Sequence, residues 1–158
     1  MEKEQELADE VDQEYLAFEA GGQSYAVTIT AVREIRGWTE PSGMPDAEPH
    51  ILGVINLRGE FLPLIDLAAK LGLNTPNIDE RSVVILVEVA EATVGLLVDS
   101  VSNIITSNAQ DMQPPPEVAK GHAPSYVSAL TLVDDKTLRI LDLSAVLQTS
   151  PTDLPMAV

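Results

Sequence analysis

Residues 53–67, Gly-Val-Ile-Asn-Leu-Arg-Gly-Glu-Phe-Leu-Pro-Leu-Ile-Asp-Leu, carry the strongest fold signal in this chain. They are typical of a β-hairpin: an apolar strand over 52–57, a short polar turn at Arg58-Gly59-Glu60, and a return strand over 61–65. Gly59 can adopt the positive φ that tight hairpin turns require. The tip of a rigid turn faces solvent, so Arg58 is a candidate for recognition; the alternative is an ordinary solvated turn residue.

The chain also contains an internal repeat. Segments 26–35 and 95–104 share apolar residues at four equivalent positions, and their spacing changes from two to three. This spacing predicts a strand that enters a single helical turn, with Thr30 or Asp99 placed to cap it. The paired positions are Val27/Leu96, Ile29/Val98, Val32/Val101 and Ile35/Ile104.

A second pair of equivalent segments, 64–71 and 140–147, repeats an Asp-Leu-x-Ala-x-Leu pattern. It predicts two short helices with Asp66 and Asp142 as N-caps and Gly72 at the end of the first helix. A carboxylate at the start of a helix favours a capping role over a catalytic one.

Each half of the chain therefore predicts a hairpin, a helical turn, a proline-containing loop, a second hairpin and a short helix. The other expected hairpins are 15–19/25–29, 83–89/94–98 and 127–133/137–141. Short strands at this spacing predict an all-β protein of two small barrels packed together, with short helices. The expected organisation is an acidic leader over 1–14, a first barrel subdomain over 15–75, a second over 76–149 with strand exchange between them, and a tail over 150–158.

The composition restricts the function. The 158 residues contain 9 Lys and Arg against 25 Asp and Glu, a formal charge of −16, and only 4% aromatic residues. This charge opposes nucleic-acid phosphates and anionic lipids and favours protein partners. No cysteine is present, which excludes disulfides and thiolate chemistry. The longest apolar runs are about five residues, whereas a membrane helix needs about 20.

Catalytic and metal-binding patterns are lacking. The two histidines, His50 and His122, lie in loops without a second ligand at helical or hairpin spacing. No nucleophile-elbow or phosphate-binding glycine pattern occurs. We therefore expect no enzyme activity, no cofactor and no metal. Besides Arg58, the other candidate is Glu34, followed by Ile35-Arg36-Gly37 and Trp38; its alternative is ordinary amphipathic packing.

Several of these motifs, taken in order, resemble the CheW-like domain family of bacterial chemotaxis coupling proteins. The resemblance runs from about Tyr15 to Leu147. It depends on Tyr15-Leu-x-Phe18, Tyr25-x-Val27-x-Ile29, Val32-x-Glu34-Ile35, Gly53-Val54-x-Asn56-Leu57-Arg58-Gly59, Pro63-x-x-Asp66-Leu67, Gly95-x-x-Val98-Asp99-x-Val101 and Pro114-Pro115-Pro116.

The resemblance implies two SH3-like five-stranded β-barrels and a non-catalytic adaptor. Such an adaptor links methyl-accepting chemoreceptors to the regulatory domain of the histidine kinase CheA, in the cytoplasm at receptor arrays beneath the inner membrane. It is expected to be monomeric alone and not to insert into the membrane. Arg58 and Glu34 match positions tied to coupling, and Gly53 and Gly59 match glycines of the same hairpin. The residues expected around a receptor-binding groove between the barrels are Val27, Ile29, Val32, Val98 and Val101.

Two departures from the family pattern are the bulky Trp38 and the acidic leader. They leave open a paralogue that serves another chemosensory pathway, and a detached regulatory domain is a further alternative. A small nucleic-acid-binding barrel is a remote alternative, because such barrels use basic grooves and stacking rings.

Overall fold

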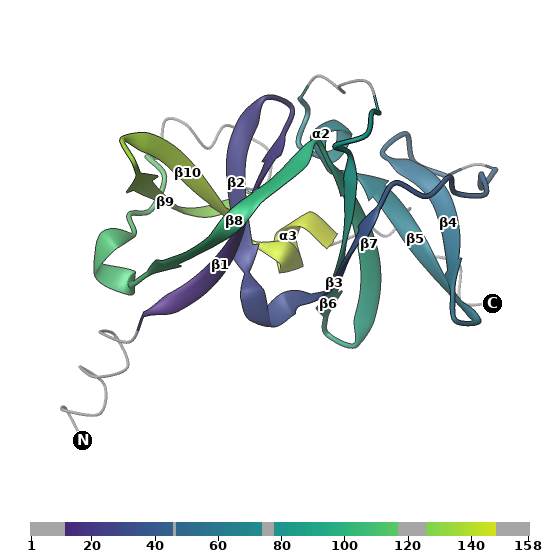
Figure 1. Ribbon diagram of the computed structural model, residues 1–158, viewed down its shortest axis with the longest axis horizontal. Helices are drawn as coiled ribbons and strands as arrows, with labels where there is room; N and C mark the ends of the chain where they lie inside the picture. Colours follow the sequence, from purple (N-terminus) through teal and green to yellow (C-terminus); the bar gives the residue numbers. More distant parts are fainter. Residues whose placement is uncertain (1–11, 46, 74–77, 117–125, 148–158) are drawn as a thin grey trace.

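The computed structural model describes residues 12–45, 47–73, 78–116 and 126–147 (Figure 1). Ten strands dominate it: β1 (Gln13–Ala20), β2 (Gln23–Thr28), β3 (Val32–Gly37), β4 (Ile51–Leu57), β5 (Glu60–Asp66), β6 (Val83–Val89), β7 (Ala92–Val98), β8 (Ser100–Ser107), β9 (Val127–Val133) and β10 (Lys136–Leu141). The short helices are η1 (Ile29–Ala31), α2 (Leu67–Lys70), η2 (Ala109–Asp111) and α3 (Leu143–Leu147).

The strands form two five-stranded, barrel-like sheets, so the expected all-β fold is confirmed. The first sheet has the order β8-β1-β2-β10-β9, and the second has the order β3-β6-β7-β5-β4. The sequence repeat explains this topology: each central hairpin, β1–β2 or β6–β7, is flanked by strands from the other repeat. A division into residues 15–75 and 76–149 describes the repeat, whereas each sheet combines strands of both halves.

All four predicted hairpins are present, with small changes at their turns. Leu57 pairs with Glu60, so the turn between β4 and β5 consists of Arg58 and Gly59 alone, and the expected three-residue turn is wrong. Both residues have positive φ, 53° and 86° respectively. This backbone matches the twist of the strands it joins. The amide of Gly59 also donates to Asn56 Oδ1 at 3.1 Å.

The predicted helical turn forms in the first repeat and not in the second. The first is η1, but Thr28, without a side-chain capping bond, occupies its N-cap position rather than Thr30. In the second repeat β8 follows Asp99 directly, so no helical turn forms there. The Asp99 carboxylate instead accepts a hydrogen bond from the amide of Gly22. Sequence analysis missed strands β3 and β8, which carry the chain from one sheet into the other.

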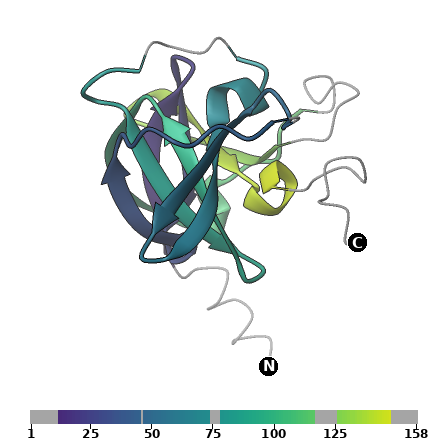
Figure 2. The same ribbon diagram turned by 90° about the vertical axis from the view of Figure 1, so that its right-hand side faces the viewer.

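The short helices have the predicted ends. Asp66 Oδ1 accepts from the amide of Ala69, and Asp142 Oδ1 accepts from the amide of Ala145, both at 3.3 Å. Gly72 follows α2 with a φ of 76°, the left-handed conformation that commonly ends helices. α3 packs beside the stacked strands (Figure 2) and buries Leu143 and Val146.

In the described part of the chain, three apolar clusters hold the fold together. Each sheet encloses a small core of its own, one around Ala26 and Ile105 and the other around Leu64 and Leu86. The largest cluster joins the sheets and includes Phe18. Because neither barrel encloses many large side chains, the shared cluster supplies much of the buried apolar area. In the part of the chain that the structure describes, no helix is long and apolar enough to cross a membrane.

Candidate partner-binding site

The β4–β5 hairpin is held in place by a close backbone approach at Gly53. This buried residue has a φ of 146°, and the segment after β3 crosses it so that Ser42 and Val54 exchange two hydrogen bonds of 2.9 Å. A Cβ on Gly53 would overlap the carbonyl group of Ser42. The hairpin therefore needs glycine at this position for packing, whatever its role toward a partner.

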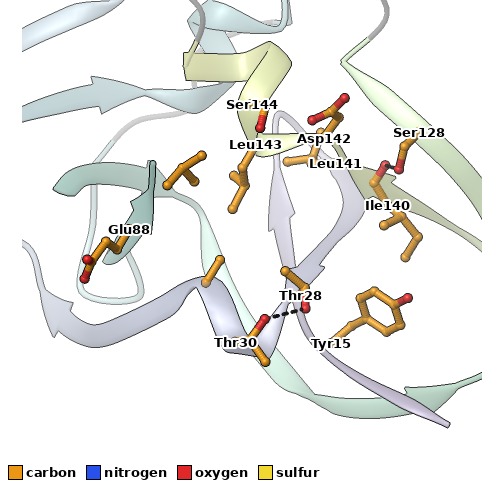
Figure 3. A pocket seen from close by; sticks show the side chains of 12 residues that line it. Tyr15, Thr28, Thr30, Glu88, Ser128, Ile140, Leu141, Asp142, Leu143 and Ser144 are labelled. Atoms are coloured by element: carbon orange, nitrogen blue, oxygen red, sulfur yellow. Dashed lines mark hydrogen bonds between the residues drawn. The ribbon is translucent and has the colours of Figure 1, made fainter. Parts of the chain in front are cut away.

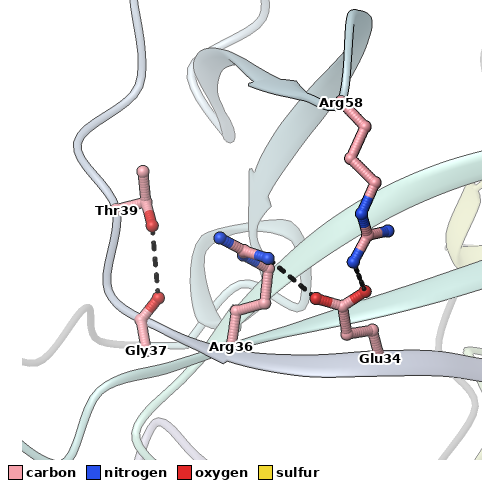
Figure 4. A network of polar contacts seen from close by, with 5 residues as sticks. All are labelled: Glu34, Arg36, Gly37, Thr39 and Arg58. Carbon is pink, nitrogen blue, oxygen red and sulfur yellow. Dashed lines mark hydrogen bonds and ion pairs between the residues drawn. The ribbon is translucent and has the colours of Figure 1, made fainter.

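The hairpin tip brings the two predicted polar residues together. Arg58 Nη2 donates to Glu34 Oε1 at 3.1 Å, and Arg36 Nη1 donates to Glu34 Oε2 at 2.8 Å (Figure 4). We call Glu34, Arg36 and Arg58 the charged cluster. Sequence analysis did not select Arg36, although its spacing of two from Glu34 in an extended strand places both side chains on one face.

The charged cluster connects the two outer strands of the second sheet. β3 and β4 are the outer strands of this sheet, Glu34 lies in β3, and Arg58 directly follows β4. Glu34 and Arg36 pair with Leu86 and Val84, whose side chains belong to the interior cluster of this barrel. The ion pairs therefore join two strands that are far apart in the sheet order, and they hold the cluster in a defined geometry.

The two arginines lower the pKa of Glu34. The hydrogen bond from Arg36 is the largest cause that lowers the pKa of Glu34, partial desolvation opposes it, and the hydrogen bond from Arg58 adds to the lowering. The three side chains are 27%, 39% and 67% exposed for Glu34, Arg36 and Arg58 respectively. Exposed ion pairs contribute little to stability. The position and charge of this cluster therefore matter more for binding than for folding.

The structure corrects part of the predicted apolar groove. Val27 and Val98 are 0% and 2% exposed and lie in the cluster that joins the sheets, so their side chains offer no surface to a partner. Ile29, Val32 and Val101 are half-buried and pack against the same cluster. The reason is geometric. All five residues lie where the chain crosses from one sheet to the other, and their side chains fill the space between the sheets there.

A cavity of about 480 Å³ does lie between the two sheets, beside η1 and α3 (Figure 3). None of the five predicted aliphatic residues lines it. Apolar groups such as Ala31, Val89 and Leu143 form part of its wall, and Glu88 and Asp142 supply carboxylates. Figure 3 shows these two side chains well apart, Glu88 on β6 and Asp142 beside α3. Such a surface suits a segment that is apolar on one face.

The remaining candidates from the sequence are the histidines and Trp38. Among the described residues, no group of three or more histidine, cysteine, aspartate or glutamate side chains could hold a metal ion. His50 is half-buried, and its carbonyl accepts from the amide of Asp66. His122 lies outside the described residues, as do most of the predicted leader and the tail. Trp38 packs partly buried against the interior cluster of the second barrel.

These features define a class of protein: two fused β-barrels whose distinctive surface is a charged cluster and a cavity between sheets, as in a binding module. The comparisons with known proteins identify the family. The CheW-like domain matches residues 14–150, and the chain belongs to the CheW-like domain family. The resemblance noted in the sequence is thereby confirmed.

Three similar proteins illustrate the relationship. The chain is 41% identical over 133 residues to chemotaxis protein CheW of Rhizobium meliloti, covering 84% of this chain and 86% of that protein. It is 42% identical over 134 residues to a probable chemotaxis protein CheW of Rhizobium etli, covering 85% and 86%. The crystal structure of the scaffolding protein TtCheW from Thermoanaerobacter tengcongensis superposes with a TM-score of 0.82 at 27% identity, covering 91% of this chain and 98% of that chain.

Proposed function

We propose that this chain is a non-catalytic scaffold that couples methyl-accepting chemoreceptors to the histidine kinase CheA in a cytoplasmic chemosensory array. The observation that carries the proposal is the charged cluster, because it combines an exposed arginine at a rigid hairpin tip with a fixed counter-charge. The relatives named as chemotaxis proteins and scaffolds support this class of function.

The two partners need separate surfaces. We assign the charged cluster to the regulatory domain of the kinase, because arginine forms directional pairs with carboxylates and is enriched at binding hot spots. We assign the cavity between the sheets to the helical tip of the receptor, because an amphipathic helix in a groove is a recurring recognition mode. The half-buried Ile29 lies in η1, which contributes to the wall of this cavity.

Such contacts are small and weak one at a time. A helical tip buries less than about 800 Å² per partner, so a monomeric scaffold would bind it weakly in isolation. An array supplies many copies side by side, and their high effective concentration raises the working affinity. A location beneath the inner membrane, where receptor tips gather, follows from this proposal.

The test is Arg58→Glu in a reconstituted system of receptor-bearing membranes and kinase. The change reverses the charge at the hairpin tip and removes the contact with Glu34. We expect kinase activation and co-sedimentation to fall severalfold while the melting temperature changes by less than about 4 °C, as for loss of an exposed pair. Arg81→Glu is the matched control, because Arg81 is 83% exposed and its only ion pair in the described chain is a long contact of 3.9 Å to Asp79.

The outcomes separate the alternatives. Activation that stays at the wild-type level in Arg58→Glu would refute the assignment of the charged cluster to coupling. Equal losses in Arg58→Glu and Arg81→Glu would indicate a general effect of net charge rather than a site. A wild-type protein that neither co-sediments with receptor membranes nor activates the kinase would contradict the proposed function itself.

A further inference from the structure

The Glu34 carboxylate is shared between two arginines that differ in how firmly they are placed. Arg36 is the closer, at 2.8 Å, and lies two residues away in the same strand. Arg58 is at 3.1 Å, is 67% exposed, and comes from a turn tip across the sheet. Among the described residues, the Arg58 guanidinium contacts Glu34 through Nη2, and most of its five donors are directed elsewhere.

The cluster is also a local exception to the charge of the molecule. The chain has 25 acidic residues and 9 Lys and Arg, yet two of those cations meet around one carboxylate here. Its local charge of about +1 suits an acidic group on a partner. A carboxylate that pairs with Arg58 would approach Glu34, and like charges that meet at an interface oppose binding.

We propose that Arg36 is a positioning residue. Its positive charge balances the negative charge of Glu34, so that Arg58 can turn to a carboxylate of the partner. The proposal deepens the proposed function, because it takes the acidic partner to be the regulatory domain of the kinase. Without Arg36, Glu34 holds Arg58 as its single cation and repels the incoming carboxylate. Arg36 itself stays on Glu34 and does not touch the partner.

The experiment measures the affinity of the purified CheA regulatory domain by titration calorimetry for five forms of the full chain. They are wild type, Arg36→Gln, Arg36→Lys, Glu34→Gln and the double variant Glu34→Gln/Arg36→Gln, each first checked for an unchanged melting temperature. We expect Arg36→Gln to weaken binding about threefold to fivefold, the range of an exposed ion pair. Arg36→Lys restores most of the affinity, because the ammonium keeps a cation beside Glu34.

The double variant decides between positioning and direct contact. When Glu34 is neutral there is no charge for Arg36 to hold, so we expect the Glu34→Gln and double variants to bind equally. An equal loss from Arg36→Gln in both backgrounds would overturn the proposal and make Arg36 a direct contact. Unchanged affinity in the wild-type background would overturn it as well. Absence of binding by the wild type would refute the kinase as partner, and with it both this inference and that part of the proposed function.

Discussion

Arg58 occupies a backbone conformation that an arginine adopts only at a cost. Its φ of 53° lies in the left-handed region, which costs an L-residue roughly 1–2 kcal/mol and which asparagine tolerates better. Asn-Gly is also the preferred pair for a two-residue hairpin turn of this kind. The change Arg58→Asn should therefore relieve strain in the turn while it removes the contact with Glu34.

The magnitude follows from two opposing contributions. Relief of backbone strain contributes up to about 1 kcal/mol, because asparagine avoids only part of the left-handed cost. Loss of the exposed pair with Glu34 costs about 0.2–1 kcal/mol. These contributions largely cancel, so we expect the free energy of unfolding to change by less than about 1 kcal/mol in either direction, while coupling to receptor and kinase falls severalfold as in Arg58→Glu.

Urea denaturation followed by circular dichroism measures the stability change. The matched control is Ala90→Asn, because Ala90 begins the β6–β7 turn with a φ of 51° and has no ion pair. Its gain in stability reports strain relief alone, so the difference between the two variants isolates the Glu34 contact. A loss of more than about 1 kcal/mol in Arg58→Asn, beside a gain in Ala90→Asn, would refute the predicted balance, because the exposed ion pair with Glu34 would then be a major stabilising contact.

Three other predictions follow from packing and charge. Gly53→Ala should cost about 3 kcal/mol or more in free energy of unfolding, from backbone strain and two lost hydrogen bonds; Gly37→Ala, whose added Cβ would meet open space, is the control, and similar values would contradict the close approach. Val27→Ala should cost about 2 kcal/mol or more and Val101→Ala clearly less, in the order of their burial. The folded pKa of Glu34 is lowered, so its stabilising contribution is present above the unfolded pKa and is lost as the pH falls through the folded value; a carboxyl titration by NMR that gives an ordinary pKa would contradict the cluster geometry.

The local features of the sequence were sufficient to predict the hairpins and the N-caps of the short helices α2 and α3, although not the caps of the helical turns. Turn residues such as Gly59, and capping residues such as Asp66 and Asp142, act within a few residues of themselves. Their conformations therefore appear directly in the sequence. The twofold repeat was visible for the same reason, because equivalent positions need equivalent side chains in each half.

Strand exchange was expected, but the strands β3 and β8, which carry the chain between the sheets, had no local signal. In β3 half-buried and exposed residues alternate, and a charged residue follows almost every apolar one, so the stretch resembles an amphipathic turn as much as a strand. Its identity as a strand depends on pairing with β6, about 50 residues later, where Ile35 lies opposite Ile85. Long-range partners of this kind determine strands more than intrinsic preference does.

The same long-range pairing explains why the candidate site was only half predicted. Arg58 and Glu34 were selected separately, one for its turn and the other for its charge beside apolar residues, and nothing local placed them 3.1 Å apart. β3 and β4 are the two outer strands of one barrel-like sheet. Among the described residues no backbone pairing joins these strands, and the contact between Glu34 and Arg58 links them through side chains instead. An outer strand needs some means of avoiding pairing with other chains, and charged side chains are one of them. A charged cluster at this place can therefore protect the sheet and bind a partner with the same residues, which is why the strained Arg58 is better explained by recognition than by stability.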